Sequence, residues 1–298
     1  MSVSSIHTRR DNARPGILFM LAAMMWFIVL DSCAKELLTR SGLPLVQVVW
    51  ARFFFNFIIG AVVIFYWWPG HMRSRRPLLQ LLRSGLLFAT TMLFNAGLTT
   101  TTLAAATTIM FLTPIVLTVL SVFVLGEHVG PRRWMSIAVG FVGALIVVRP
   151  GMVEFNVGVL LLLAAAVTNS VYQLTTRKLA GLDDPRTSFF YTAAVGAIGA
   201  SFVVPFAWAT PQAFDWGLLV AMGVLGGAGH LFLVLAFDRA PVSLLAPFVY
   251  TQLVWAAIFG YAIFGEIPDR WTVAGAALIC ASGLYIFYRE QLKAGTRA

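Results

Sequence analysis

The sequence predicts an all-α integral membrane protein with ten transmembrane helices, arranged as two inverted five-helix repeats. Three observations support this fold class. The 298 residues are 59% hydrophobic and only 11% charged, with a mean hydropathy of +0.85, whereas soluble domains carry about 25% charged residues. Long apolar segments alternate with short turns that contain Pro, Gly and basic residues. The end of the first half of the chain is similar to the end of the second half.

Ten segments are long and apolar enough to cross a bilayer, which takes about 20 helical residues. They are too long and too uniformly apolar to be the alternating strands of a barrel, so helices are expected. The first segment has no small-residue cleavage site behind it and is expected to be retained rather than removed as a signal peptide. The expected spans are 17–38, 44–68, 77–98, 101–125, 131–149, 155–176, 186–208, 214–237, 241–264 and 270–288.

The basic residues predict the orientation in the membrane. Most of the 21 Lys and Arg residues fall on the side of the two chain ends, whereas Lys35, Arg40, Arg149 and Arg270 fall on the other side. Because basic loops stay in the cytoplasm, we expect cytoplasmic tails at 1–16 and 289–298 and a bacterial inner-membrane location. The net charge of +9 comes from such flanking clusters, which argues against nucleic-acid binding.

A repeat is visible in the turns that precede the last helix of each half. Gly126-Glu127 matches Gly265-Glu266, and Arg133-Trp134 matches Arg270-Trp271. The predicted repeats are 17–149 and 155–288. Since five spans per half is an odd number, the second half must enter the membrane from the opposite side, as in many secondary transporters. The alternative is a chance match between residues that are common at helix ends.

Two ionisable residues lie deep within the first two spans. The stretch VVWARFFFNFII carries Arg52 eight residues after Pro44, roughly 12 Å from that face of the membrane. Asp31 lies seven residues before Leu38 in the preceding span, roughly 10 Å from the same face. We expect the two side chains to form an intramembrane pair or to line one water-filled cavity. A purely structural pair, contact with substrate or protons, and reach of Arg52 to the headgroups all remain open.

Further polar residues recur inside the spans at helical spacing. Amides, a histidine and aromatic rings together would suit a flat, hydrogen-bonding ligand that is uncharged or zwitterionic. Each amide has the alternative role of a hydrogen bond between helices, and the histidine has the alternatives of close packing or proton relay. Besides Asp31 and Arg52, the candidate pocket residues are Asn56, Asn95, Asn169, Tyr172, Gln173, His230, Tyr250 and Gln252.

Other embedded residues are given structural interpretations. Glu127 and Glu266 lie at span ends, where they are expected to stabilise turns and helix dipoles. Arg83 lies near one end of the third span and is expected to reach the headgroups. Pro114 and Pro247 fall within the fourth and ninth spans, where the missing N–H permits a kink.

The sequence argues against several other functions. The four histidines are scattered, so a clustered catalytic site is not expected, although an integral-membrane enzyme is kept as the alternative of another class. Cys33 and Cys280 are far apart and indicate neither a disulfide nor a metal site. Neither a phosphate-binding loop nor a channel filter is visible. We therefore expect no catalytic residue, metal or cofactor. The expected partners are a small-molecule substrate and the lipid bilayer, and a homodimer is left open.

The motifs together resemble the EamA type of drug/metabolite transporters. They are the segment TTIMFLTP at 107–114, the turns LGE and FGE, and a glycine-rich last helix after a tryptophan in each half. Leu253 stands where the second half would repeat Pro114, so a hinge at that proline is not expected to be duplicated. The resemblance covers nearly the whole chain and implies an inner-membrane carrier that works by alternating access, with its substrate site between the halves.

Two short motifs are similar to one branch of that family. DSCAK at 31–35 and WARF at 50–53 resemble the carriers for riboflavin and S-adenosylmethionine uptake. The resemblance therefore implies uptake of a flavin such as riboflavin, or of a nucleoside-like compound. Export of amino acids or drugs is the alternative.

Overall fold

The computed structural model describes residues 14–67, 74–126, 130–149, 156–179 and 182–295. Within these ranges the regular structure is entirely helical. Glu127 and residues 1–13 of the predicted N-terminal tail lie outside them. The helices are α2 (Arg14–Thr39), α3 (Leu45–Trp67), α4 (Pro77–Leu98), α5 (Leu103–Met110), α6 (Thr113–Leu125), α7 (Pro131–Val148), α8 (Val157–Leu179), α9 (Pro185–Ser201), the 3₁₀-helix η1 (Val204–Ala207), α10 (Ala213–Arg239), α11 (Val242–Val249), α12 (Thr251–Phe264) and α13 (Arg270–Gly295).

The prediction of an all-α membrane protein is confirmed. Six helical stretches of the described chain are long and apolar enough to cross a membrane. Helical residues 45–61 and 134–148 are apolar but shorter. The count of ten spans stays a prediction, and some expected boundaries differ: α9 ends at Ser201, because Pro205 in the following 3₁₀ turn lacks the N–H needed to continue an α-helix. The six stretches are 14–39, 77–98, 103–124, 157–179, 213–239 and 247–264.

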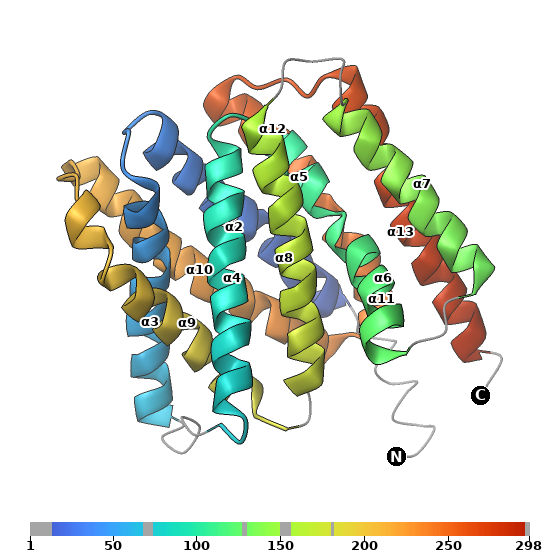
Figure 1. Ribbon diagram of the computed structural model, residues 1–298, viewed down its shortest axis with the longest axis horizontal. Coiled ribbons are helices and arrows are strands. Elements are labelled where there is room, and N and C mark those ends of the chain that lie inside the picture. The colour runs from blue at the N-terminus through green and yellow to red at the C-terminus, as the bar shows by residue number, and fades with distance from the viewer. Residues whose placement is uncertain (1–13, 68–73, 127–129, 150–155, 180–181, 296–298) are drawn as a thin grey trace.

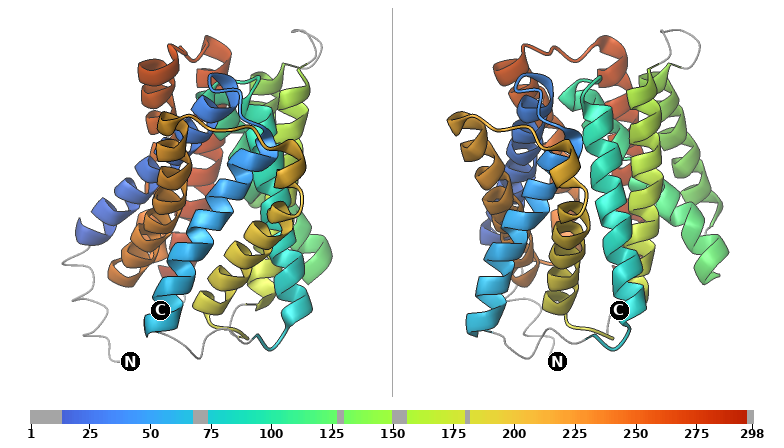
Figure 2. Two further views of the ribbon diagram at one scale, coloured as in Figure 1. Left: turned by 90° about the vertical axis from the view of Figure 1, so that its left-hand side faces the viewer. Right: turned by 60° about the vertical axis from the view of Figure 1, so that its left-hand side comes forward.

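Helices that are distant in sequence pack side by side (Figures 1 and 2). Helix α2 packs against α10, α4 against α8, α3 against α9, and α7 against α13. The α7–α13 contact requires glycine on both sides, because a Cβ at Gly143 would lie 2.9 Å from the carbonyl oxygen of Gly275. Glycine at both positions therefore allows the two helix backbones to approach closely.

Two of the expected spans are interrupted. Segment 101–125 consists of α5 and α6, separated at Phe111 and Leu112, and segment 241–264 consists of α11 and α12, separated at Tyr250. The N–H of Phe111 donates to the carbonyl of Thr108 at 3.1 Å, and the N–H of Tyr250 donates to the carbonyl of Pro247 at 3.3 Å. These three-residue hydrogen bonds mark a tightened turn where the α-helical ladder stops.

The interruption occurs in both halves, although the position of Pro114 is not duplicated. Pro114 lies in the first turn of α6, just after its break, whereas Pro247 lies inside α11, just before its break. The breaks agree with the expectation that Pro114 and Pro247 each permit a kink, and Pro114 itself has no equivalent proline in the second half, as expected. A proline on either side removes one helical hydrogen bond, so different residues produce a similar interruption.

Candidate functional site

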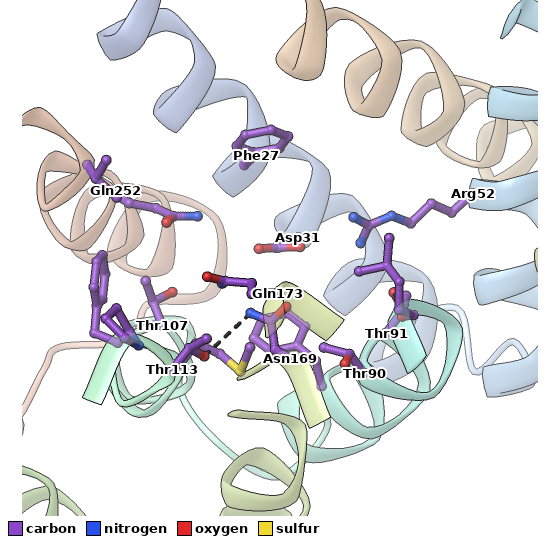
Figure 3. A pocket seen from close by; sticks show the side chains of 16 residues that line it. Phe27, Asp31, Arg52, Thr90, Thr91, Thr107, Thr113, Asn169, Gln173 and Gln252 are labelled. Carbon is purple, nitrogen blue, oxygen red and sulfur yellow. Dashed lines mark hydrogen bonds between the residues drawn. The ribbon is translucent and has the colours of Figure 1, made fainter. Parts of the chain in front are cut away.

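A cavity of about 320 Å³ lies between elements of both halves of the chain. Helices α2 to α6 contribute side chains from the first half, and α8, α11 and α12 contribute side chains from the second half. Figure 3 shows polar groups from these helices converging on one space. Of the candidate pocket residues, those that line this cavity are Asp31, Arg52, Asn169, Gln173 and Gln252.

Asp31 on α2 and Arg52 on α3 both face the cavity (Figure 3). Among the described residues, no ion pair within 4.0 Å and no hydrogen bond joins the two side chains or engages either with another residue. Of the expected arrangements, the geometry matches two charges that line one cavity. It does not match a direct structural pair, and Arg52 does not point to a membrane surface.

Threonines form the polar wall of the cavity. The hydroxyls of Thr90 and Thr91 on α4 donate to the carbonyls of Leu86 and Leu87, at 2.8 and 2.9 Å. The hydroxyl of Thr107 on α5 donates to its own helix in the same way. A hydroxyl that has used its proton still carries two lone pairs. This wall therefore offers acceptors to a ligand in the cavity.

Amide side chains face this wall from α8 and α12. The Asn169 Nδ2 lies 3.4 Å from the Thr113 hydroxyl oxygen, the contact dashed in Figure 3. Gln173 and Gln252 line the cavity without a protein hydrogen-bond partner in the described part of the chain. A primary amide carries two donors and an acceptor. The two glutamines are therefore free to form hydrogen bonds with polar groups of a ligand.

Both helix breaks lie beside the cavity. Phe111 at the first break lines it, and Val249 and Gln252 line it on either side of the second break. The hydroxyl of Ser170 on α8 donates to the Thr113 carbonyl at 3.0 Å, next to the first break. Irregular backbone at membrane depth is tolerated where it lines a cavity and finds side-chain partners.

Three other candidate residues contact helices instead of lining the cavity. Tyr172 accepts a hydrogen bond from Arg83 at 2.8 Å. His230 packs edge-on against Phe27, with ring centroids 5.2 Å apart, which matches the packing alternative. Tyr250 stacks on Phe111.

Two asparagines also lie outside the cavity lining. Asn56 faces α10, where a Cβ at Gly226 would lie 3.4 Å from its Nδ2. Asn95 is 1% exposed and donates to the carbonyl of Thr91 at 2.9 Å. The Oδ1 atoms of both asparagines are buried without a hydrogen-bond partner, and in the described part of the chain neither side chain makes a hydrogen bond to another helix.

The expectation for Arg83 was wrong. Its side chain is buried, with 7% of the residue exposed, and does not reach the headgroups. The guanidinium donates to the Thr176 hydroxyl at 2.8 Å, the Thr192 hydroxyl at 2.7 Å and the Ser188 carbonyl at 3.1 Å. Helices α8 and α9 pack against α4, so neutral oxygens surround the charge before it can reach lipid.

Sequence reasoning missed the threonines and the aromatic lining residues Phe27 and Phe94. A threonine whose hydroxyl donates a hydrogen bond to a carbonyl of its own helix is common in apolar spans. Such a residue does not stand out as polar in a hydropathy profile. One signal was available: Thr107 and Thr113 both fall within the segment TTIMFLTP at 107–114 that supported the family resemblance.

Comparisons with known proteins now add to this geometry. The sequence matches the EamA-like transporter family over residues 14–149 and again over residues 156–288. It is 32% identical to an S-adenosylmethionine uptake transporter of Rickettsia prowazekii, over 93% of this chain and 93% of that protein. It is 25% identical to a riboflavin transporter of Rhizobium johnstonii, with 97% and 96% covered.

Two further similarities concern export and fold. A pseudopaline exporter of Pseudomonas aeruginosa is 28% identical, with 90% of this chain and 94% of that protein covered. A solved crystal structure superposes with a TM-score of 0.62 at 19% identity, over 90% of this chain and 94% of the other. At that identity the superposition speaks for the fold alone.

Proposed function

Because this chain belongs to the EamA-like transporter family, we propose that it takes up S-adenosylmethionine across the bacterial inner membrane. The family makes it a multi-pass membrane transporter of small molecules and not an enzyme. The observation that carries the substrate proposal is the pair of opposite charges, Asp31 and Arg52, which share one cavity without an ion pair.

The chemistry of S-adenosylmethionine is complementary to this cavity. Its sulfonium and ammonium groups are cations suited to Asp31, and its carboxylate suits the planar guanidinium of Arg52. The adenine ring can stack on the aromatic lining, and its edge can hydrogen-bond to Gln173 or Gln252. A cavity of about 320 Å³ lies at the small end of the range for ligand pockets, about 300–1,000 Å³.

Riboflavin is the second candidate and is supported by the relative of that name. Its ring system is uncharged at neutral pH, so it would leave Asp31 and Arg52 without ionic partners. Buried charges that lose hydration without gaining a partner are costly. The charges of the cavity therefore favour S-adenosylmethionine, which carries both positive and negative groups, over the flavin that the sequence motifs also suggested.

The transport mechanism we propose is alternating access by ten spans in two inverted repeats, 17–149 and 155–288. Support comes from the helix contacts: α2 packs on α10 as α8 packs on α4, and α6 contacts α8 as α12 contacts α2. Exchanging the two halves turns each contact into its partner. In this arrangement both chain ends lie in the cytoplasm, as the basic loops indicate.

The test is uptake of radiolabelled S-adenosylmethionine by proteoliposomes that contain the purified protein. We expect saturable uptake that unlabelled S-adenosylmethionine inhibits more strongly than S-adenosylhomocysteine, which lacks the sulfonium charge. Inhibition by methionine alone would indicate an amino-acid carrier. Uptake of radiolabelled riboflavin in place of S-adenosylmethionine would overturn the proposal in favour of the flavin. Transport of S-adenosylmethionine only when its concentration gradient across the membrane is reversed would indicate export.

A further inference from the structure

A largely buried ion pair joins Lys35 to Glu266 at the end of the bundle where α12 connects to α13, opposite the chain ends marked N and C in Figure 1. Lys35 follows Asp31 by four residues on α2, so the two side chains share a helix face. Lys35 therefore lies about 6 Å further along the α2 axis than Asp31, toward that end. Lys35 is buried, with 5% of the residue exposed, and neither Lys35 nor Glu266 is among the residues that line the cavity.

The ion pair joins the two halves of the chain. The Lys35 ammonium contacts the carboxylate of Glu266, in the turn between α12 and α13, and also donates to the Thr101 carbonyl at 2.6 Å. The same carboxylate accepts a hydrogen bond from the N–H of Leu103 at 2.9 Å. Leu103 is the first residue of α5, so Glu266 stabilises the N-terminus of a helix in the other half.

This geometry revises the interpretation of Glu266. Its carboxylate was expected to complement a helix dipole at a span end, and it does so for α5 and not only within its own turn. Because Thr107, Met110 and Phe111 of the α5 region line the cavity, the ion pair also holds one cavity wall in place. A second link lies further out, where Arg40 donates to the Ile263 carbonyl at 2.8 Å.

An ion pair that closes a cavity regains hydration energy when it opens, which an apolar closure does not. Two buried ions lose much hydration, and their attraction offsets that cost only while they remain paired. If this end of the bundle opens, water reaches both ions and returns their hydration energy. The side chain of Glu266 is already 19% exposed. The closed and open states can therefore lie close in free energy, which a cycling carrier requires.

We propose that the Lys35–Glu266 ion pair is a reversible latch that opens and closes the cavity at this end during each transport cycle, and that α5 moves with Glu266. The inference rests on the alternating-access mechanism proposed above. It assigns Lys35 and Glu266 as positioning residues outside the substrate cavity.

The first experiment measures access to the cavity and needs no substrate. Cys33 and Cys280 are replaced by alanine, and Thr90→Cys places one thiol in the cavity lining. Labelling by a membrane-impermeant maleimide is then followed in right-side-out and inverted vesicles. Ile267→Cys, at a residue 74% exposed in the α12–α13 turn, reports which vesicle face carries the latch.

We expect Glu266→Ala to raise labelling from the latch side about tenfold or more, because removing one partner of a buried pair shifts a closed–open equilibrium by at least that factor. Glu266→Gln, which keeps an acceptor for the Leu103 N–H, should give a smaller increase. Glu36→Gln is the matched control, since the ion pair of Glu36 with Arg40, the residue after the end of α2, lies within the first half and the substitution keeps Arg40, which donates to the Ile263 carbonyl.

The second experiment locks the latch. Lys35→Cys with Glu266→Cys is joined by a short bifunctional thiol reagent that can be cleaved by reduction. We expect cavity labelling from the latch side to stop when the cysteines are joined and to return on reduction. Unchanged labelling in Glu266→Ala and in Glu266→Gln, with both proteins monodisperse, would overturn the latch. Because neither readout uses S-adenosylmethionine, that result would be distinct from a failure of the substrate proposal.

Discussion

The ring of Phe111 stacks on the ring of Tyr250, with centroids 5.0 Å apart and planes inclined by 23°. Each residue marks the break in one of the two interrupted segments. The offset that aligns Gly126 with Gly265 also aligns Phe111 with Tyr250. The contact therefore joins equivalent points of the two halves at the edge of the cavity, which supports a two-fold relation between them.

Removing this stack should weaken transport more than removing the tyrosine hydroxyl. We expect Tyr250→Phe to keep uptake near the parent rate, because the ring remains. Tyr250→Ala should lose an aromatic pair worth about 0.5–1.5 kcal/mol and slow uptake by about threefold to tenfold. Initial uptake rates in proteoliposomes check this, with equal protein incorporation as the control. Equal rates for the two variants would show that the stack has no role.

Asp31→Asn and Arg52→Gln should weaken substrate binding while leaving the protein folded. Hydrogen bonds to charged groups contribute about 1.5–3 kcal/mol, so each variant should raise the Kd for S-adenosylmethionine by about tenfold to one hundredfold. Folding should be retained because the two side chains form no ion pair with each other. Ligand-induced thermal stabilisation of the purified protein measures both effects.

A control ligand tests whether Asp31 binds the sulfonium group of S-adenosylmethionine. S-Adenosylhomocysteine lacks the sulfonium charge, so Asp31→Asn should weaken its binding less than that of S-adenosylmethionine. Glu36 is a carboxylate on the same helix that pairs with Arg40. Glu36→Gln should therefore change the binding of neither ligand. If Asp31→Asn weakened both ligands equally, Asp31 would not recognise the sulfonium group.

Arg83 should be a determinant of stability and not of affinity. It donates four hydrogen bonds to α8 and α9, and a lysine cannot reproduce this planar arrangement. We expect Arg83→Lys to lower the free energy of unfolding by about 1–3 kcal/mol, and Tyr172→Phe, which removes one acceptor, to lower it less. Thermal unfolding in detergent measures this. Unchanged stability combined with weakened substrate binding would instead place Arg83 on the substrate route.

Asp183 should make the free energy of unfolding depend on pH in the acid range. Burial alone would raise its pKa, but hydrogen bonds from Ser74, the Arg75 N–H and Gln80, together with the Arg75 charge, lower the pKa below its usual value of 3.8. A depressed pKa adds stability above the unfolded-state pKa, and this stability is lost as the pH falls through the folded-state pKa.

We therefore expect Asp183→Asn to melt at a lower temperature than the parent near pH 7, and the difference to shrink as the pH falls below about 4. Thermal melts of the detergent-solubilised protein across this range measure the effect. Ser74→Ala removes one of the donors and should give part of the same loss. A difference between Asp183→Asn and the parent that stayed constant with pH would contradict the assignment.

The all-helical membrane architecture could be derived from the residues alone, because hydrocarbon forces long apolar segments to satisfy their own backbone hydrogen bonds. The family followed from short motifs placed in order along the chain, and the match over 14–149 and 156–288 confirms it. The shared depth of Asp31 and Arg52 was likewise readable from their positions, since rise per residue converts sequence distance into membrane depth.

Tertiary structure decided which polar faces meet the cavity. Helical periodicity predicts that residues share a face, but not which neighbouring helix that face contacts. Gln173 therefore lines the cavity while the adjacent Tyr172 binds Arg83. The Lys35–Glu266 contact joins residues far apart in the chain, and no spacing rule within one helix could have predicted it. Segment length and hydropathy are local properties, whereas the substrate site and its closure depend on how the two halves pack together.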